Sequence, residues 1–331
     1  MKAIVYTEYG SPDVLHLKAV EKPTPKDNEV LIKIRATSVN FGDTLARNFK
    51  AITFRTFTMP APLLIPTKIM FGIRKPKIRI LGAEFAGDIE AIGKDVTQFK
   101  VGDAVFSYTG PSFGGNAEYV CVPETGNVAI KPENLTYEEA STVPYGAITA
   151  LLLLRKAAIK PGQKVLINGA SGAIGSYALQ LARYYGAEVT GVCGTQRMDF
   201  VKALGADHVI DYTREDFTQN GQQYDLILDI LGKSSFARAK ESLTPNGRFM
   251  LASFKIKHLF QMLWTSRMSS KKVVCAMAFE SQDDLIAVKD LVEAGAITTT
   301  IDKSFPLEET AAAHRYYESG ERRGNVIVTI A

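Results

Sequence analysis

The chain has 331 residues, which is more than one ordinary hydrophobic core supports, so we expect two domains. Hydrophobic residues make up 46% and charged residues 22%, as in ordinary globular enzymes, and a net charge of +4 is too small and too dispersed to indicate a nucleic-acid partner. The three cysteines lack metal-ligand or disulfide spacing, which argues against a thiolate metal cage and a disulfide scaffold.

The N-terminal third has the pattern of a compact β-rich unit. Met1–Gly10 has no apolar core followed by a cleavage site, which indicates a strand rather than a signal peptide. Together with the cysteine usage, this predicts a cytoplasmic protein. Glu29–Asn40 alternates apolar and polar residues, as a half-buried strand does. Two further strands, punctuated by glycine, are predicted within 80–93 and 101–108.

A long apolar stretch, Ala51–Gly72, follows the first of these strands. It is broken by Arg55 and Lys68, and the uncharged run between them is shorter than the roughly 20 residues that span a bilayer. Its three prolines exclude one regular helix over the whole stretch. We expect an irregular apolar flap or pocket wall, with peripheral membrane contact as the less favoured alternative.

The pattern changes near Ala129. Thr136–Ile159 is helical in period and begins with a capping-box pattern. Beyond it, apolar strands and helices alternate, as in a parallel sheet covered by helices on both faces. The tail from Ile297 adds a strand, a helix and a strand, which we expect to return to the β-rich domain. The alternating part predicts strands at 164–169, 188–193, 208–212, 224–232 and 247–253, and helices at 173–186, 197–205 and 234–243.

Asn168–Arg197 carries the pattern of a dinucleotide site. Small residues after the strand let backbone N–H groups approach a phosphate, and a helix N-terminus attracts its negative charge. The pattern is not a strict GxGxxG, and alone it would also fit a tight strand-to-helix turn in another doubly wound protein. The strand before it, the helix after it and the alternating units beyond favour a cofactor. The residues expected at the phosphates are Ala170, Ser171, Gly172, Ala173, Ile174 and Gly175.

The end of the second strand predicts which nicotinamide cofactor binds. A ribose with a free 2′-hydroxyl is bound by Asp or Glu about 20 residues beyond the glycine turn, but Cys193–Gln196 contains no acid. Thr195 and Arg197 can bind a 2′-phosphate, which a carboxylate would repel. NADPH is therefore favoured over NADH. Tyr212 is a further candidate contact to the adenosine phosphate, the alternative being a half-exposed tyrosine at a strand end.

Five segments carry a resemblance to a known family: "VNFGD", "GAEFAGDIEAIGKDVTQFKVGDAVF", "LINGASGAIGSYALQLAR", "LGADHVIDY" and "HRYYESGERRGNVIV". Nearly the whole chain resembles the medium-chain dehydrogenase/reductase superfamily and, within it, the zinc-independent quinone oxidoreductase (zeta-crystallin-like) branch. The resemblance implies an α/β protein with a GroES-like catalytic domain (1–124 and 296–331) and a Rossmann NADP-binding domain (125–295). It also implies NADPH as hydride donor and a homodimer, and it places Ala51–Gly72 at the mouth of the active site.

The resemblance also shows where zinc ligands would stand. Zinc-dependent relatives place a cysteine after an early strand, a histidine in a "GHE" element and a second cysteine before a helix. Here Asn40 or a neighbour, Ala83 and Tyr145 occupy these positions. Glu84 alone cannot hold an ion that takes three protein ligands and a water. We therefore expect no metal and interpret Glu84 as a structural carboxylate.

Without a metal, hydrogen-bond donors must polarise the substrate carbonyl. The candidates are Asn40, Asp43 and Tyr145. Leu45 stands where the branch often has a tyrosine, which leaves the proton donor open: Tyr145 either substitutes for it or is an aromatic residue packed over the nicotinamide. Thr149 matches a threonine that the family places against the nicotinamide.

These patterns predict an NADPH-dependent reductase that transfers hydride to a quinone or to an α,β-unsaturated carbonyl, with a small hydrophobic acceptor as substrate. An NADPH-binding structural or sensor protein with little turnover is a second hypothesis, motivated by Leu45. A zinc alcohol dehydrogenase is a third, and the missing ligands disfavour it.

Overall fold

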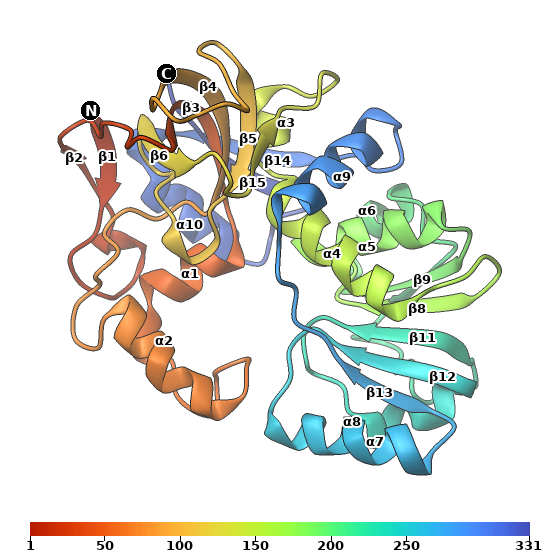
Figure 1. Cartoon of the computed structure of the whole chain (residues 1–331). Helices are drawn as coiled ribbons and strands as arrows, with labels where there is room; N and C mark the ends of the chain where they lie inside the picture. The colour runs from red at the N-terminus through yellow and green to blue at the C-terminus, as the bar shows by residue number, and fades with distance from the viewer. The chain divides into compact units, whose positions relative to one another are not determined.

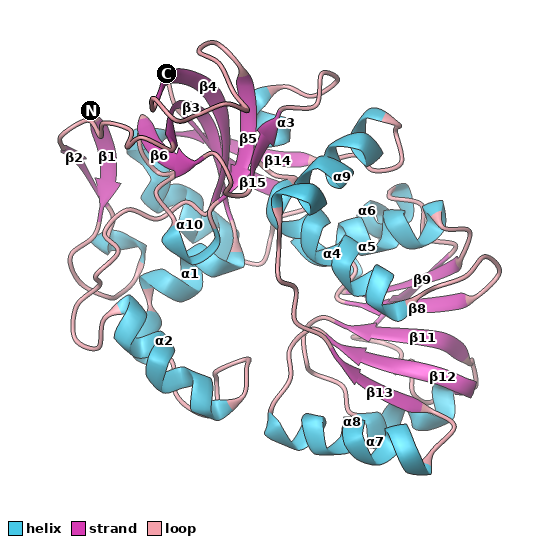
Figure 2. Cartoon of the chain, in the orientation of Figure 1, coloured by secondary structure: helices cyan, strands magenta, loops and turns pink.

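The computed structural model describes residues 1–331, which form two compact units. Unit 1 comprises Met1–Thr53, Ile65–Tyr145 and Glu280–Ala331, and unit 2 comprises Phe54–Leu64 and Gly146–Phe279. Figure 1 colours the chain from its N-terminus to its C-terminus, and Figure 2 distinguishes its helices from its strands. None of the helices combines the length and the apolar composition that crossing a bilayer requires.

Unit 1 is built on a seven-stranded sheet in the order β14-β15-β3-β4-β5-β7, with β6 also paired to β3. The alternation in β3 buries Val30, Ile32 and Ile34 completely. The strands are β3 (Glu29–Val39), β4 (Glu84–Ile92), β5 (Ala104–Tyr108), β6 (Tyr119–Pro123), β7 (Val128–Ile130), β14 (Ile301–Pro306) and β15 (Asn325–Thr329). The C-terminal strands β14 and β15 thus extend the sheet that the N-terminal segment begins, while β1 (Lys2–Val5) and β2 (His16–Ala19) pair separately.

Short helices surround this sheet. They are α1 (Phe41–Arg47), α2 (Leu64–Phe71), α3 (Tyr137–Ala140), α9 (Gln282–Glu293) and α10 (Thr310–Glu318). Thr136 and Glu139 form the predicted capping box at the start of α3. The stretch Thr136–Ile159 is not one helix, because Pro144 lacks an N–H and begins a second helix, α4 (Pro144–Ala157).

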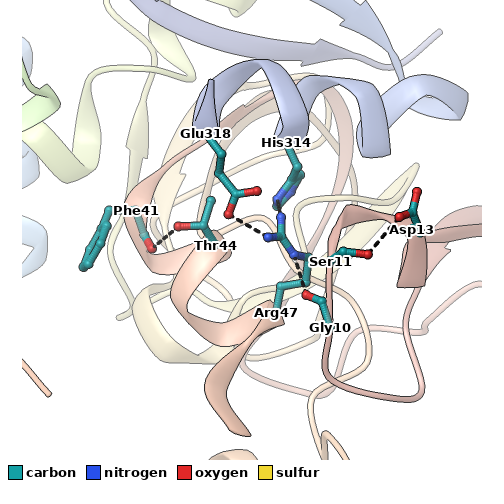
Figure 3. A network of polar contacts seen from close by, with 8 residues as sticks. All are labelled: Gly10, Ser11, Asp13, Phe41, Thr44, Arg47, His314 and Glu318. Carbon is teal, nitrogen blue, oxygen red and sulfur yellow. Dashed lines mark hydrogen bonds and ion pairs between the residues drawn. The ribbon is translucent and has the colours of Figure 1, made fainter. Parts of the chain in front are cut away.

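Arg47 ties α1 to α10 through a buried polar network, shown in Figure 3. Its Nη1 lies 2.8 Å from His314 Nδ1, and its Nη2 donates to Glu318 Oε1 at 2.6 Å. Its Nε donates to the Gly10 carbonyl at 3.1 Å. Burial and the nearby guanidinium lower the pKa of His314 to about 3, so the ring is neutral and Nδ1 accepts from Arg47. This network fixes α1, whose first residues belong to the candidate site.

The second half of the expected flap is helical. α2 contains Pro66 in its first turn, where the missing N–H costs no helical bond. Phe71, at its end, stacks on Phe49 with ring centroids 4.7 Å apart, and the Tyr9 hydroxyl donates to the Phe71 carbonyl at 2.8 Å. The exposed apolar side chains of this helix are Ile65, Ile69 and Met70. The second half of the stretch is therefore an anchored helix with an exposed apolar side, while residues 51–63 are irregular apart from short 3-10 turns, as expected for a flap.

Unit 2 is a six-stranded parallel sheet in the order β10-β9-β8-β11-β12-β13, as predicted for a Rossmann domain. Its core includes the fully buried Leu166, Ile227 and Phe249. The strands are β8 (Lys164–Asn168), β9 (Glu188–Cys193), β10 (His208–Asp211), β11 (Tyr224–Asp229), β12 (Leu243–Leu251) and β13 (Lys272–Cys275). The helices are α5 (Ala173–Tyr184), α6 (Met198–Ala203), α7 (Phe236–Ala239) and α8 (Ile256–Met268), besides most of α4.

The unit boundaries differ from the predicted domains 1–124, 125–295 and 296–331. β7 pairs with β5, which keeps the segment after residue 124 in unit 1. α9 belongs there too, because the Gln282 side chain donates to the carbonyls of Glu124 and Val128 at 2.9 and 2.8 Å. Part of the flap belongs to unit 2, where the Phe254 N–H donates to the Thr58 carbonyl at 3.1 Å.

Candidate dinucleotide and catalytic sites

The carboxyl ends of β8 and β11 are where a doubly wound sheet binds its ligand, because the strand order reverses between them. Gly169 follows β8 with φ +97°, a conformation that favours glycine. A Cβ on Gly175 would lie 2.1 Å from the Gly169 carbonyl oxygen, so α5 packs closely on the turn. A Cβ on Gly172 would meet only that same oxygen, at 3.4 Å. The outer side of the turn is therefore open.

The start of α5 supplies donors to this open side. Gly172 precedes the helix and no side chain caps it, so the N–H groups of Ala173 and Ile174 have no side-chain acceptor. Ala170 is fully buried beneath the turn, and Ser171 is half-buried. Free amides at the positive end of a twelve-residue helix fit a phosphate group, so the predicted pyrophosphate cradle agrees with the local geometry.

Asp229 organises the neighbouring strand end and was not predicted as a site residue. Its Oδ1 accepts from Asn168 Nδ2 at 3.0 Å and from the Gly232 N–H at 3.1 Å, and its Oδ2 accepts from the Ser234 N–H at 2.9 Å. Burial raises the pKa of this carboxyl. Asp229 therefore joins the ends of β8 and β11 and shapes the loop that follows β11.

The end of β9 holds the two residues predicted to select NADPH. Arg197 Nη1 lies 3.5 Å from Ser171 Oγ, which places the guanidinium beside the glycine turn. The exposed Thr195 donates its hydroxyl hydrogen to Asp211 Oδ2, and Thr213 Oγ1 lies 3.1 Å from Thr195 Oγ1. The hydrogen bond from Thr195 is the main reason that the pKa of Asp211 lies below its usual range.

Asp211 is a polar residue at this end of the sheet that the sequence patterns did not indicate. It ends β10, one strand further out than the acid that binds a ribose diol, and both its oxygens accept from threonine hydroxyls. It therefore orients Thr195. The sequence signal for Asp211 is an acid at the end of β10, where it pairs with Cys193 at the end of β9.

Tyr212 and Thr149 complete the predicted cofactor set. Tyr212 is 65% exposed, and a Cβ on Gly194 would lie 3.4 Å from its hydroxyl, so the ring lies beside the β9 end. Thr149 is buried on α4. The structure thus brings the glycine turn, Arg197 and Tyr212 to one end of the parallel sheet.

Glu84, at the start of β4, is the hub of a second polar cluster, in unit 1. Its Oε1 accepts from the Ser38 hydroxyl and from Asn40 Nδ2, the latter at 3.4 Å. Its Oε2 accepts from the Tyr145 backbone N–H at 2.8 Å. Burial raises the pKa of Glu84 to about 7. One carboxyl group, that of Glu84, thus positions two catalytic candidates, Asn40 and Tyr145. The sequence indicated only a structural role for Glu84.

Asp43 has a structural position in the same cluster. It forms a capping box with Asn40 at the start of α1: its Oδ2 accepts from the Asn40 N–H at 3.0 Å, and its own N–H donates to Asn40 Oδ1 at 3.2 Å. Its Oδ1 accepts from the Gly82 N–H at 2.8 Å. The side chain is completely buried, and burial raises its pKa to about 6. Asp43 thus clamps α1 to the segment before β4.

Tyr145 carries the only hydroxyl group among the three candidates. It lies in the first turn of α4, and its half-buried ring is 5.7 Å from the Tyr108 ring at an interplanar angle of 40°. Burial raises the pKa of its phenol above the ordinary value. The hydroxyl therefore keeps its proton at neutral pH and is a weaker acid than a free tyrosine, so it can donate a hydrogen bond to a developing oxyanion.

The two buried carboxyl groups predict that stability falls as the pH rises. The pKa values of Glu84 and Asp43 are raised from 4.5 and 3.8 to about 7 and about 6. Between the lower and the higher values the folded chain binds more protons than the unfolded chain, so the free energy of unfolding decreases with pH in that window. Melting temperatures of the wild type and Glu84→Gln should converge or cross toward pH 7, because the variant cannot ionise there. Identical pH slopes in both proteins would contradict this prediction.

The fold and the two clusters define an oxidoreductase of the class that uses a nicotinamide dinucleotide. Residues 26–133 match the family "Alcohol dehydrogenase GroES-like domain", and residues 204–328 match "Zinc-binding dehydrogenase". The chain belongs to the medium-chain dehydrogenase/reductase superfamily, in its quinone oxidoreductase branch. This confirms the resemblance seen in the sequence and the GroES-like plus Rossmann fold.

Individual relatives show the range of this branch. The chain is 31% identical to the "Chloroplast envelope quinone oxidoreductase homolog" of Arabidopsis thaliana, over 99% of this chain and 98% of that protein. It is 29% identical to an Arabidopsis thaliana "NADPH-dependent alkenal/one oxidoreductase, chloroplastic", over 99% and 79%. The solved structure of the quinone oxidoreductase from Coxiella burnetii is 27% identical and covers 100% of this chain and 99% of its own, with a TM-score of 0.84.

The zinc ligands of the wider family can be checked against the structure. The positions that the resemblance assigned to histidine and to the second cysteine hold Ala83 and Tyr145, and the Tyr145 N–H bonds to Glu84. Among residues 1–331, no three His, Cys, Asp or Glu side chains are grouped so that they could hold a metal ion. The donor set therefore does not fit a zinc centre of the alcohol dehydrogenase type.

Proposed function

We propose that this protein is an NADPH-dependent reductase that transfers hydride to a quinone or to the β-carbon of an α,β-unsaturated carbonyl without zinc. The observation that carries the proposal is the pairing of an open glycine turn with Arg197 beside it, in a chain whose relatives include quinone and alkenal/one oxidoreductases. NADPH oxidation followed against a panel of quinones and enones tests it. Binding of NADPH without turnover on any acceptor would favour the sensor hypothesis.

Each cluster has its own part in this function. When bound, the nicotinamide supplies the hydride, and the protein orients it and excludes water. The α5 amides hold the pyrophosphate, and Arg197 holds the 2′-phosphate, with Tyr212 beside it. Thr195 joins them when its hydroxyl hydrogen turns from Asp211 to the phosphate. In unit 1, the Tyr145 hydroxyl donates a hydrogen bond to the acceptor oxygen as negative charge develops there. Asn40 has a second amide hydrogen beyond the one that bonds Glu84, and Asp43 holds α1 in place.

A preference for bulky hydrophobic acceptors follows from the position that the family gives to Ala51–Gly72. Apolar area buried on a substrate stabilises binding by about 25 cal/mol per Å² at most, before ordering costs. Shortening the segment ahead of α2 should raise KM for a large quinone more than for a small one. An unchanged ratio of the two KM values, together with a lower melting temperature or an altered oligomeric state, would show that the segment only seals the structure.

Zinc independence has a direct test. Protein purified and dialysed under mild conditions should carry no stoichiometric zinc, because Ala83 and Tyr145 replace two ligands. Elemental analysis decides the point. One tightly held zinc per chain, with activity lost on its removal, would instead support the alcohol dehydrogenase hypothesis.

We further propose a cytoplasmic homodimer, as the cysteine usage and the family resemblance imply, to be tested by sedimentation and cell fractionation.

A further inference from the structure

The side of α8 that faces solvent is apolar. Its inner side is fixed by Leu259 and Met262, which pack against the core of unit 2, and by the buried Thr265. A surface helix ordinarily turns its polar side outward, and α8 does the reverse. The exposed fractions are 38% for Ile256, 67% for Phe260, 50% for Leu263, 58% for Trp264 and 72% for Met268. Their spacing places all five on one side of the helix.

The charged residues near this apolar face in the sequence are all cationic. No acidic residue occurs between Glu241 and Glu280. The exposed Lys257 and Arg267 lie on the same side of α8 as the apolar residues, and no carboxylate pairs with either of them. An apolar centre containing tryptophan and phenylalanine, beside unpaired cations, is the composition of helices that lie in a membrane interface.

We propose that the apolar face of α8 docks this protein on an anionic membrane surface, with the helix lying in the plane of the bilayer. Phe260, Leu263, Trp264 and Met268 would enter the boundary between headgroups and acyl chains, and Lys257 and Arg267 would remain at the level of the phosphates. Docking needs no spanning segment. The sequence patterns made peripheral membrane contact of Ala51–Gly72 the less favoured alternative and gave no indication of this helix.

Two other occupants fit the surface less well. In a two-fold contact the same patch of both copies meets, so the Lys257 and Arg267 of both copies would enter one interface that has no acid near them in sequence. The exposed apolar area is on the order of 500 Å², given 150–250 Å² for a large aromatic side chain, against about 800 Å² per partner in a standard interface. A nucleic acid would leave the apolar centre without contacts.

Trp264 is the only tryptophan in the chain and lies within this face, so its emission reports directly on docking. The full chain is mixed with phosphatidylcholine vesicles containing about one third phosphatidylglycerol, and with vesicles of phosphatidylcholine alone. We expect flotation with the anionic vesicles, a blue shift of Trp264 emission and quenching by brominated acyl chains. High salt should weaken the binding.

Two double variants and a control separate the contributions. Phe260→Ser with Leu263→Ser should lower vesicle partitioning at least about tenfold, and Lys257→Gln with Arg267→Gln should remove most of the preference for anionic lipid. Ile286→Gln, which changes a side chain 43% exposed on the acidic helix α9, should leave partitioning unchanged. All the changed side chains are exposed, and melting temperatures close to that of the wild type verify folding.

Three outcomes would overturn the proposal. The first is no flotation with anionic vesicles. The second is flotation without a change in Trp264 emission, which would place the contact elsewhere on the chain. The third is a blue-shifted emission without lipid that grows with protein concentration and is abolished by Phe260→Ser with Leu263→Ser, which would assign this face to a second copy.

Discussion

Replacing Arg197 with alanine is expected to weaken NADPH binding about 10- to 100-fold while leaving NADH binding nearly unchanged. The guanidinium lies beside the glycine turn, 3.5 Å from Ser171 Oγ, and follows the segment Cys193–Gln196, which contains no acid. A charge-assisted hydrogen bond to phosphate contributes roughly 1.5–3 kcal/mol, which corresponds to this range of affinity. Titration with each cofactor, followed by fluorescence or calorimetry, measures the effect.

A control variant tests whether the loss of NADPH affinity is specific to Arg197. Lys202→Ala removes an exposed cation from α6, the helix that follows Arg197, and should leave both affinities unchanged. Asp211→Asn should not weaken NADPH binding, because it removes a carboxylate that accepts the hydroxyl hydrogen of Thr195 and would repel a 2′-phosphate, and it removes no contact to the phosphate. Equal losses for NADPH and NADH in Arg197→Ala would contradict the assignment of Arg197 to the 2′-phosphate.

The parallel sheet and its dinucleotide turn could be predicted from the sequence because their signals are local. Continuous apolar strands alternate with helices, and the glycine turn follows the first of these strands directly. The capping box at Thr136 and the strand end at Arg197 are likewise set by adjacent residues. Each of these predictions needed only a few neighbouring positions.

Contacts between segments that are distant in the sequence could not be predicted from such local patterns. Glu84 gathers Ser38, Asn40 and Tyr145 from two separate parts of the chain, and Asp229 bonds Asn168 across two strands. No periodicity links these positions. A lone acid inside an apolar strand pattern marks each carboxylate as special, but its partners become apparent only when the sheet is assembled.

The region between Ser253 and Ile297 was the least predictable. It contains α8, β13 and α9, none of which the sequence patterns predicted. α8 exposes apolar residues and turns Thr265 inward, so the usual rule of apolar inside and polar outside assigns its faces wrongly. The four residues of β13 are too few for a clear alternation. Departures of this kind are expected where a surface has a function beyond folding.

Replacing Tyr145 with phenylalanine is expected to lower kcat about 100-fold or more, with little change in the affinity for NADPH. The change removes one hydroxyl and keeps both the ring and the backbone N–H that bonds Glu84 at 2.8 Å. Loss of one hydrogen-bond donor to a developing oxyanion typically lowers kcat about 10²- to 10³-fold, and a phenol whose pKa is raised by burial keeps its hydrogen at neutral pH. Steady-state kinetics on a quinone and on an enone measure the loss.

Tyr108→Phe is the matched control, because its ring lies 5.7 Å from that of Tyr145 and burial also raises the pKa of its phenol. It should keep kcat within a few-fold of the wild type. If Tyr108→Phe caused the larger loss, the proton donor would be Tyr108 and Tyr145 would be packing.

Asn40→Ala is less informative on its own, since it also removes the capping box of α1 and is expected to destabilise the fold by about 1 kcal/mol. A kcat loss in Asn40→Ala that persists well below its melting temperature, beside an active Tyr145→Phe, would move the oxyanion contact from the phenol to the amide.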